Sequence, residues 1–278
     1  MLQMKVGLTD TTGTIDAEMM TAVAAALNVQ VTRDLPQFWP VSATVSYLPN
    51  HKKVPQGVWP VQLVKSLPPG EGGFHTTRHH NQPYAKVIAT PGSDEWTVDA
   101  SHETIEMLVD PAGNRLQTST AIAIVDNDIQ DATGQFEYLV EACDPCEADA
   151  YTYQISGVSV SDFLTPHFYD LNPTPGARYS FTGAIQRPRQ ILPGGYISWI
   201  DPESNEVQQI LWVDPTQPPQ LNNLGPASGA SLRGFVEIHT HHKVHERRAR
   251  PTAERVAARK AFRERMENVA EIRAKHYA

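Results

Sequence analysis

Cysteine is scarce in this sequence, and long apolar runs are missing from it. The chain of 278 residues has only two cysteines, Cys143 and Cys146, so a disulfide framework cannot be what holds it together. Its longest apolar candidate, residues 22–29, falls far short of the ~18 residues that a membrane helix needs, and it contains Asn28. We therefore predict a chain without a membrane-spanning segment that depends on a hydrophobic core.

A secretory signal is also missing from residues 1–10. They contain no basic region followed by an apolar stretch and a small-residue cleavage site, so we expect the chain to stay inside the cell. Apolar residues make up 40% of the sequence and charged residues 19%. This composition is typical of a globular protein rather than of a disordered or fibrous one.

Charge is divided unevenly along the chain. Residues 243–278 carry 11 Lys or Arg and 5 Glu, a net charge of +6, whereas the whole chain has −8 and the remainder therefore −14. The same segment has a narrow apolar stripe at helical spacing, formed by Ala258, Phe262, Met266, Val269 and Ile272. We predict a basic amphipathic helix that docks on a protein partner or on a second copy of the chain. Binding to nucleic acid phosphates is less favoured, because glutamates are interleaved with the basic residues.

The periodicity of apolar residues predicts an α+β fold with four consecutive parts. Residues 1–115 have the pattern strand, helix, three strands, helix, and residues 116–214 are mainly strands. Residues 215–242, rich in Pro, Gly, Asn and Ser, are predicted to be a linker to the helical tail of residues 243–278. Within the first part, the polar stretch 75–81 is expected to be a loop.

The second predicted helix carries the pattern H-E-x-x-E. This helix is expected to begin at Asp99 or Ser101 and to end at Val109. Positions four apart share one face of a helix, so His102 and Glu106 can hold one metal ion. Zinc accepts a carboxylate oxygen as well as an imidazole nitrogen. Glu103, next to the first ligand, is placed to act as the general base that activates water.

The rest of the metal site is left open by the sequence. Asp110 follows His102 by about 12 Å along a continuous helix, so it can share the ion only if Pro111 bends the chain. Otherwise Asp110 would orient another ligand. The candidates for a third ligand are His75, Glu141, Asp144, Glu147, Asp149 and His167.

Zinc is the expected ion, and calcium is an alternative. The acidic residues between 141 and 149 would suit calcium, which takes six to eight oxygen ligands. Pro145 prevents an interpretation of this segment as a calcium loop of the EF-hand kind. The pair Cys143 and Cys146 has the spacing of half a zinc site, but no second cysteine pair is available to complete one.

Three short segments, one of them in the predicted metal helix, have a recognisable pattern. They are Asp99-Ala100-Ser101-His102-Glu103 with Glu106 and Asp110-Pro111, Gly73-Phe74-His75, and Glu141-Ala142-Cys143-Asp144 with Glu147-Ala148-Asp149. With them the chain resembles an uncharacterised zincin-like family of bacterial and phage genomes that has the pattern S-H-E-x-x-E-x-x-x-D-P. The resemblance spans about residues 5–213 and implies a zincin-like fold with a metal at His102 and Glu106. The predicted order of elements up to Val109 is also that of zincin metallopeptidases.

Two functions of different classes follow from these expectations. As an enzyme, the protein would be a zinc-dependent peptidase in which Glu103 activates water beside the ion held by His102 and Glu106. As a structural protein, it would be a non-catalytic component of a phage virion or a related particle, anchored through residues 243–278. The expected location is accordingly the cytoplasm or a phage-like particle.

Overall fold

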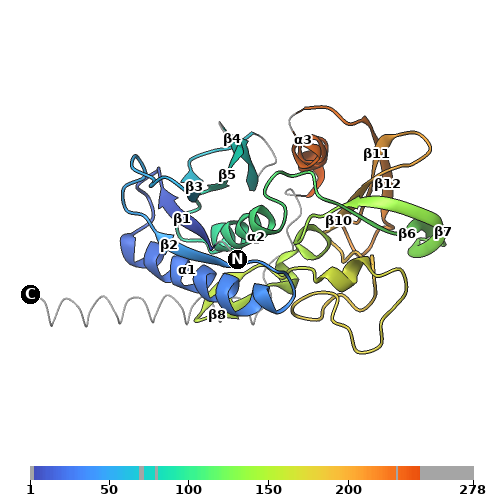
Figure 1. Ribbon diagram of the computed structural model, residues 1–278, viewed down its shortest axis with the longest axis horizontal. Helices are drawn as coiled ribbons and strands as arrows, with labels where there is room; N and C mark the ends of the chain where they lie inside the picture. Colours follow the sequence, from blue (N-terminus) through green and yellow to red (C-terminus); the bar gives the residue numbers. More distant parts are fainter. Residues whose placement is uncertain (1–2, 69–71, 79–80, 230, 245–278) are drawn as a thin grey trace, which may run out of the picture.

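Two five-stranded sheets and three α-helices dominate the part of the chain that the computed structural model describes, residues 3–68, 72–78, 81–229 and 231–244. In Figure 1 the first sheet with α1 and α2 lies on one side, the second sheet lies on the other, and α3 lies between them. The first half contains β1 (Met4–Asp10), α1 (Ala17–Val29), β2 (Ala43–Tyr47), β3 (Val58–Val64), β4 (Gly73–Arg78), β5 (Gln82–Ile88) and α2 (Glu95–Val109). The second half contains β6 (Leu116–Val125), β7 (Asp128–Leu139), β8 (Tyr153–Ile155), β9 (Val158–Val160), β10 (Tyr196–Ile200), β11 (Glu206–Leu211), β12 (Gln220–Pro226) and α3 (Leu232–Val244).

The first sheet has the strand order β2-β1-β3-β5-β4. Its strands run parallel except for β4, which is antiparallel to β5. Both α1 and α2 pack on this sheet, and α1 begins after Asp16, whose carboxylate accepts a hydrogen bond from the backbone N–H of Met19. The helices and strands share a core whose fully buried members include Leu8, Leu27, Leu63 and Ile105. This core fixes the position of α2, the predicted metal helix.

Strand β4 corrects the prediction that residues 75–81 form a loop, because residues up to Arg78 are in the strand. β4 is the last strand of the sheet, and Gly73 and His75 are buried in it while Phe74 is half-buried. Successive side chains of a strand point to opposite faces, so only every second residue of an edge strand has to fit the interior. A polar sequence can therefore form this strand.

Helix α2 begins at Glu95, earlier than the predicted start at Asp99 or Ser101. Both of those side chains are buried within the helix rather than placed at its end. The hydroxyl of Ser101 donates a hydrogen bond to the side-chain oxygen of Gln30, at 2.8 Å. Ser101 thus joins α2 to the turn that follows α1. Serine is also common at helix ends, which is why the sequence predicted a helix start here.

The second sheet is antiparallel and has the order β12-β11-β10-β7-β6. Aromatic stacking stabilises its centre, where the rings of Phe136 and Trp199 lie 4.9 Å apart. The predicted α+β class is confirmed, with a mixed sheet in the first half and an antiparallel sheet in the second. Membership of a zincin-like family stays a prediction.

The segment predicted to be a linker, residues 215–242, is instead part of the folded body. It contains β12, which pairs with β11, and most of α3. Leu232, Phe235 and Val236 of α3 pack against the second sheet. Together with residues of that sheet they form a small core, separate from the main one. These three residues have helical spacing, but the preceding Pro, Gly, Asn and Ser residues dominate the composition of the segment. The tail helix predicted beyond it, residues 245–278, lies outside the described residues.

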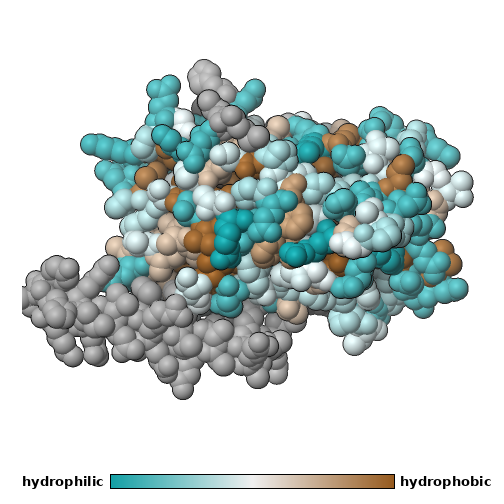
Figure 2. All heavy atoms as spheres, turned by 60° about the horizontal axis from the view of Figure 1, so that its bottom comes forward, coloured by the Kyte–Doolittle hydropathy of each residue, from teal (hydrophilic) through white to brown (hydrophobic). Residues whose placement is uncertain are grey.

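None of the described helices has both the length and the apolar character that crossing a bilayer requires. On the face shown in Figure 2, hydrophilic and hydrophobic side chains are interspersed over the described residues.

Candidate metal centre

Helix α2 holds three ionisable side chains, His102, Glu103 and Glu106, in the interior of the protein. None of the three residues is more than 9% exposed, and Glu106 is fully buried. Charged side chains are almost never buried to this extent unless they are paired. The partners of these side chains come from β4, from the segment that follows β7, and from α3.

His102 and Glu106 converge on one face of α2, as their spacing predicted. The Nε2 atom of His102 lies 3.2 Å from Oε2 of Glu106 and 3.1 Å from Oδ1 of Asp144. Two ligands of a tetrahedral zinc ion, each at about 2.0–2.2 Å, would be separated by about 3.3 Å. The imidazole is therefore spaced from both carboxylates as the ligands of a single ion would be.

Asp144 and Glu141 reach this place from the segment after β7. Asp144 begins a short 3-10 turn, Asp144–Cys146, and the backbone N–H of Cys143 donates to Oε1 of Glu106 at 2.9 Å. Among the described residues, the buried atoms Oε1 of Glu141 and Oδ2 of Asp144 have no hydrogen-bond partner. Leaving a buried polar atom unpaired costs about 1–3 kcal/mol, and a charged one costs more. Two such oxygens in one cluster require an explanation.

The ionisable side chains form three overlapping groups, and in each group the ligand atoms lie within 4.8 Å of one another. The groups are His102 with Asp144 and Glu147, Glu106 with Glu141 and Asp144, and His75 with Glu103 and Glu106. Asp144 and Glu106 each belong to two groups, so the three form one continuous cluster. The fold thus brings together several residues that the sequence left as alternatives for the third ligand.

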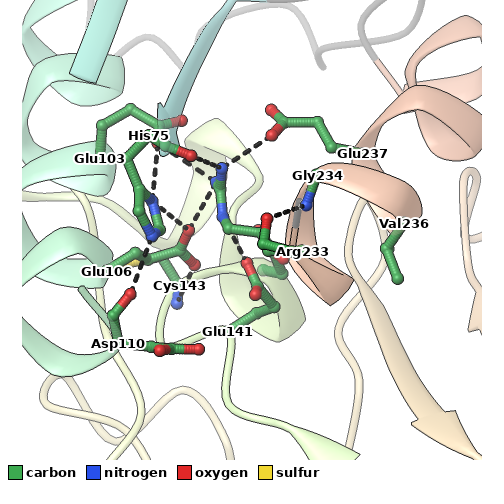
Figure 3. A network of polar contacts seen from close by, with 12 residues as sticks. His75, Glu103, Glu106, Asp110, Glu141, Cys143, Arg233, Gly234, Val236 and Glu237 are labelled. Atoms are coloured by element: carbon green, nitrogen blue, oxygen red, sulfur yellow. Dashed lines mark hydrogen bonds and ion pairs between the residues drawn. The ribbon is translucent and has the colours of Figure 1, made fainter. Parts of the chain in front are cut away.

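Arg233 is the member of the cluster that the sequence analysis missed. Its guanidinium donates to four carboxylates, as Figure 3 shows. Nη2 lies 3.2 Å from Oε2 of Glu103 and 2.8 Å from Oε2 of Glu106. Nε lies 2.7 Å from Oε2 of Glu141, and Nη1 lies 2.7 Å from Oε2 of Glu237. The helical spacing of the apolar residues on either side of Arg233 is the signal that could have placed it on a packed helix.

Glu103, the predicted general base, lies between β4 and α3. Its Oε2 contacts Nδ1 of His75 at 3.3 Å and Nη2 of Arg233 at 3.2 Å. A Cβ atom at Gly73 would lie 3.1 Å from Oε1 of Glu103, so β4 passes close to the other oxygen. Glu103 is therefore enclosed by protein atoms on both sides of its carboxylate.

Asp110 holds other residues in place. It ends α2, and its Oδ2 accepts a hydrogen bond from the backbone N–H of Arg115 at 2.7 Å. Its carbonyl oxygen lies 3.1 Å from Nε2 of His75. Asp110 is in none of the three groups found among the described residues, so its contacts match the orienting role that the sequence left open rather than the role of a ligand.

Two further candidates for the third ligand lie elsewhere. His167 is at the surface and contacts the carboxylate of Asp170 at 2.8 Å. Asp149 is buried, but it is not a member of the three groups. Neither residue thus belongs to the three groups around α2.

The cluster moves the pKa values of its members in opposite directions. Burial alone would raise the pKa of Glu103 and Glu106, but Arg233 and the neighbouring histidines outweigh it, and both pKa values are lowered. Burial also opposes a charge on His102, yet the carboxylates of Glu106 and Asp144 raise its pKa well above the usual value. The contacts within the cluster thus favour the charged form of all three side chains.

Glu141 and Asp144 behave differently. Burial raises the pKa of Glu141 well above its usual value, although Arg233 opposes this effect. Burial and the carboxylate of Glu106 likewise raise the pKa of Asp144, although His102 opposes them. The two residues with unpartnered oxygens are thus the two carboxylates of the cluster whose pKa values burial raises.

Comparison of the chain with protein-family models, with curated protein sequences and with solved structures finds no match. The functional argument therefore depends on the geometry of this cluster.

Proposed function

We propose that the protein binds one divalent cation through His102, Glu106, Glu141 and Asp144. The observation that carries the proposal is the pair of buried carboxylate oxygens, Oε1 of Glu141 and Oδ2 of Asp144, that have no partner among the described residues. A divalent ion would supply both oxygens with a ligand bond. It would also neutralise carboxylates that Arg233 and His102 together do not balance.

Zinc fits the donor atoms better than calcium does. Calcium takes oxygen ligands, whereas zinc is bound by imidazole nitrogen as well as by carboxylate oxygen. The imidazole of His102 stands at ligand spacing from two carboxylates, which favours zinc. Glu147, which forms a group with His102 and Asp144, is a further oxygen donor at the same place.

The role that this site supports best is structural. His102 and Glu106 belong to α2, whereas Glu141 and Asp144 follow β7 of the second half, so one ion would cross-link the two halves of the protein. The residues of the site are at most 9% exposed, which leaves a peptide substrate no direct access to the ion. A structural metal site is therefore favoured over a catalytic one.

A metal-dependent peptidase is the second candidate. It is supported by the convergence of His102 and Glu106, with Glu103 adjacent in the sequence, which is the arrangement that metal-assisted hydrolysis needs. The enclosed position of Glu103 argues against it, because a general base must reach the attacking water. If the protein were a peptidase, Glu103→Gln would abolish cleavage of a denatured protein substrate while the ion stayed bound.

Elemental analysis of the full chain, purified without a histidine tag and reconstituted with Zn²⁺, tests the metal site. We expect close to one zinc ion per chain in the wild type and loss of that ion in Asp144→Asn. His167→Ala is the matched control, because it removes a histidine that also contacts a carboxylate but lies at the surface. A reconstituted wild type without zinc, or Asp144→Asn with unchanged zinc, would contradict the proposal.

A further inference from the structure

The guanidinium of Arg233 contacts the same oxygens that a second metal ion would need. His75, Glu103 and Glu106 form one of the three groups with ligand atoms within 4.8 Å of one another. Nη2 of Arg233 donates to Oε2 of Glu103 and to Oε2 of Glu106. A metal ion in this group and the guanidinium in its observed position would compete for both carboxylates.

The orientation of His75 supports a cation position in this group. Its Nε2 faces the carbonyl oxygen of Asp110 at 3.1 Å, and a carbonyl can only accept, so Nε2 carries a proton. Nδ1 then points at Oε2 of Glu103, at 3.3 Å, and lies 4.0 Å from Oε2 of Glu106. A histidine that donates one ring N–H to a backbone carbonyl and aims its other nitrogen at carboxylates has the arrangement of a metal ligand.

Glu141 connects this position to the proposed metal site. Its Oε2 accepts from Nε of Arg233, while its Oε1 is buried and has no hydrogen-bond partner among the described residues. The carboxylate is 5% exposed, so solvent does not supply the missing partner. One oxygen of Glu141 thus binds the guanidinium, and the other receives no hydrogen bond from the described side chains of the cluster.

We propose that Arg233 occupies a second cation position, formed by His75, Glu103 and Glu106, and thereby limits the protein to one divalent ion. This inference rests on the proposed function, because it concerns the neighbour of the metal site proposed above. Glu106 belongs to both positions and would bridge two ions, as carboxylates do where metals lie about 3.5–4 Å apart. Without the guanidinium, the second position would accept a divalent cation.

Backbone contacts hold Arg233 in place independently of its side chain. The backbone N–H of Arg233 donates to the carbonyl of Gly113 at 2.9 Å, and that of Leu232 donates to Oδ1 of Asn114 at 2.8 Å. Leu232, on the same turn of α3, is also part of the small core against the second sheet. A substitution that removes only the guanidinium therefore keeps these backbone contacts, although it takes away the buried charge.

Zinc stoichiometry of the metal-stripped full chain, measured by equilibrium dialysis and elemental analysis, tests the inference. We expect one Zn²⁺ per chain in the wild type and two in Arg233→Met, which keeps the length of the side chain and removes its charge. Arg233→Lys is the matched control and should bind one ion, because it keeps a positive charge in the position. A single ion in Arg233→Met, or two in Arg233→Lys, would overturn the inference.

The single substitution His75→Ala tests the assignment of the two positions even if Arg233→Met fails to fold. His75→Ala should keep the one ion of the wild type, because the first position does not use His75, and Arg233→Met with His75→Ala should fall from two ions to one. Loss of the ion in the single variant His75→Ala would mean that the native ion binds at the position formed by His75, Glu103 and Glu106. That result would overturn the inference. A wild type that binds no zinc would overturn the proposed function, whereas one ion in both the wild type and folded Arg233→Met would overturn only the role of Arg233.

Discussion

Arg233 donates a hydrogen bond from Nε to Oε2 of Glu141 at 2.7 Å, across 92 residues of sequence and with both side chains about 95% buried. The same guanidinium bonds to Glu103 and Glu106 of α2. It therefore connects α3, the segment after β7 and the predicted metal helix through one buried cation. The stability of all three elements should depend on this cation.

Removal of the Arg233 charge should destabilise the metal-free protein. Breaking a buried ion pair by removing one partner costs about 3–5 kcal/mol, because the remaining charge is left in the interior. We expect a loss of this size for Arg233→Met in urea unfolding without metal. Arg187→Met is the control, since Arg187 is 37% exposed and its pair with Asp128 should be worth about 1 kcal/mol or less. Equal losses in the two variants would contradict the importance of the buried network.

Chelation should lower the thermal stability of the zinc-loaded protein. An ion that binds only the folded state, at a concentration a hundred times its Kd, stabilises that state by about 2.7 kcal/mol. For a domain of this size the effect corresponds to roughly 5–10 °C in Tm. EDTA should therefore lower the Tm of the wild type, and added Zn²⁺ should restore it, whereas Asp144→Asn should respond to neither. A wild-type Tm that EDTA leaves unchanged would count against the metal site.

Gly195 controls the position of Asp144. A Cβ atom at Gly195 would lie 2.5 Å from the carbonyl oxygen of Asp144 and 2.8 Å from that of Pro145. Both are backbone atoms, so Gly195→Ala must displace the loop that carries the proposed ligand. We expect a loss of about 1–3 kcal/mol in stability together with reduced zinc content, both measured on the reconstituted chain.

Gly176→Ala is the control for this substitution. No atom lies within 4 Å of a Cβ there, but the backbone has φ +78°, so alanine should cost about 1 kcal/mol through strain alone. Its zinc content should equal that of the wild type. If Gly195→Ala kept full zinc content, the position of Asp144 would not matter for the ion.

Asp162 should make the stability of the protein depend on pH. It is fully buried, and burial raises its pKa although Thr182 and the backbone N–H of Phe163 donate hydrogen bonds to its carboxylate. The folded state thus holds the proton more tightly than the unfolded chain does. The contribution of Asp162 to stability is therefore full below its unfolded pKa of about 3.9 and is lost as the pH rises through the folded pKa.

Urea unfolding of Asp162→Asn at several pH values checks this prediction. The variant carries no charge, so its stability should rise relative to the wild type as the pH increases from about 4 to about 7. Asp201→Asn should show the opposite trend, because hydrogen bonds from the backbone of Ser204 and Glu203 lower the pKa of Asp201. The wild type should lose its advantage over that variant as the pH falls. Parallel pH profiles of the wild type and Asp162→Asn would refute the assignment.

The sequence predicted the position of some residues of the cluster but not of others. Periodicity placed His102 and Glu106 on one face of a helix, because residues four apart in a helix are neighbours whatever surrounds them. It did not place His75 on a strand, because the alternation of β4 is obscured by its polar residues. Composition also made the segment with Arg233 look like a linker, although three apolar residues around it pack into a core.

What the sequence alone determined is the local chemistry: an α+β chain, a helix with an imidazole and two carboxylates, and a list of acidic residues able to join them. The tertiary structure decided which of them meet. Glu106 and Arg233 are 127 residues apart, yet Nη2 and Oε2 are separated by 2.8 Å. Such a contact depends on how the two sheets and α3 pack together, and no spacing rule within one element encodes it. The position of Asp144 beside His102, that of His167 at the surface, and the presence of an arginine beside the proposed metal site follow from that packing.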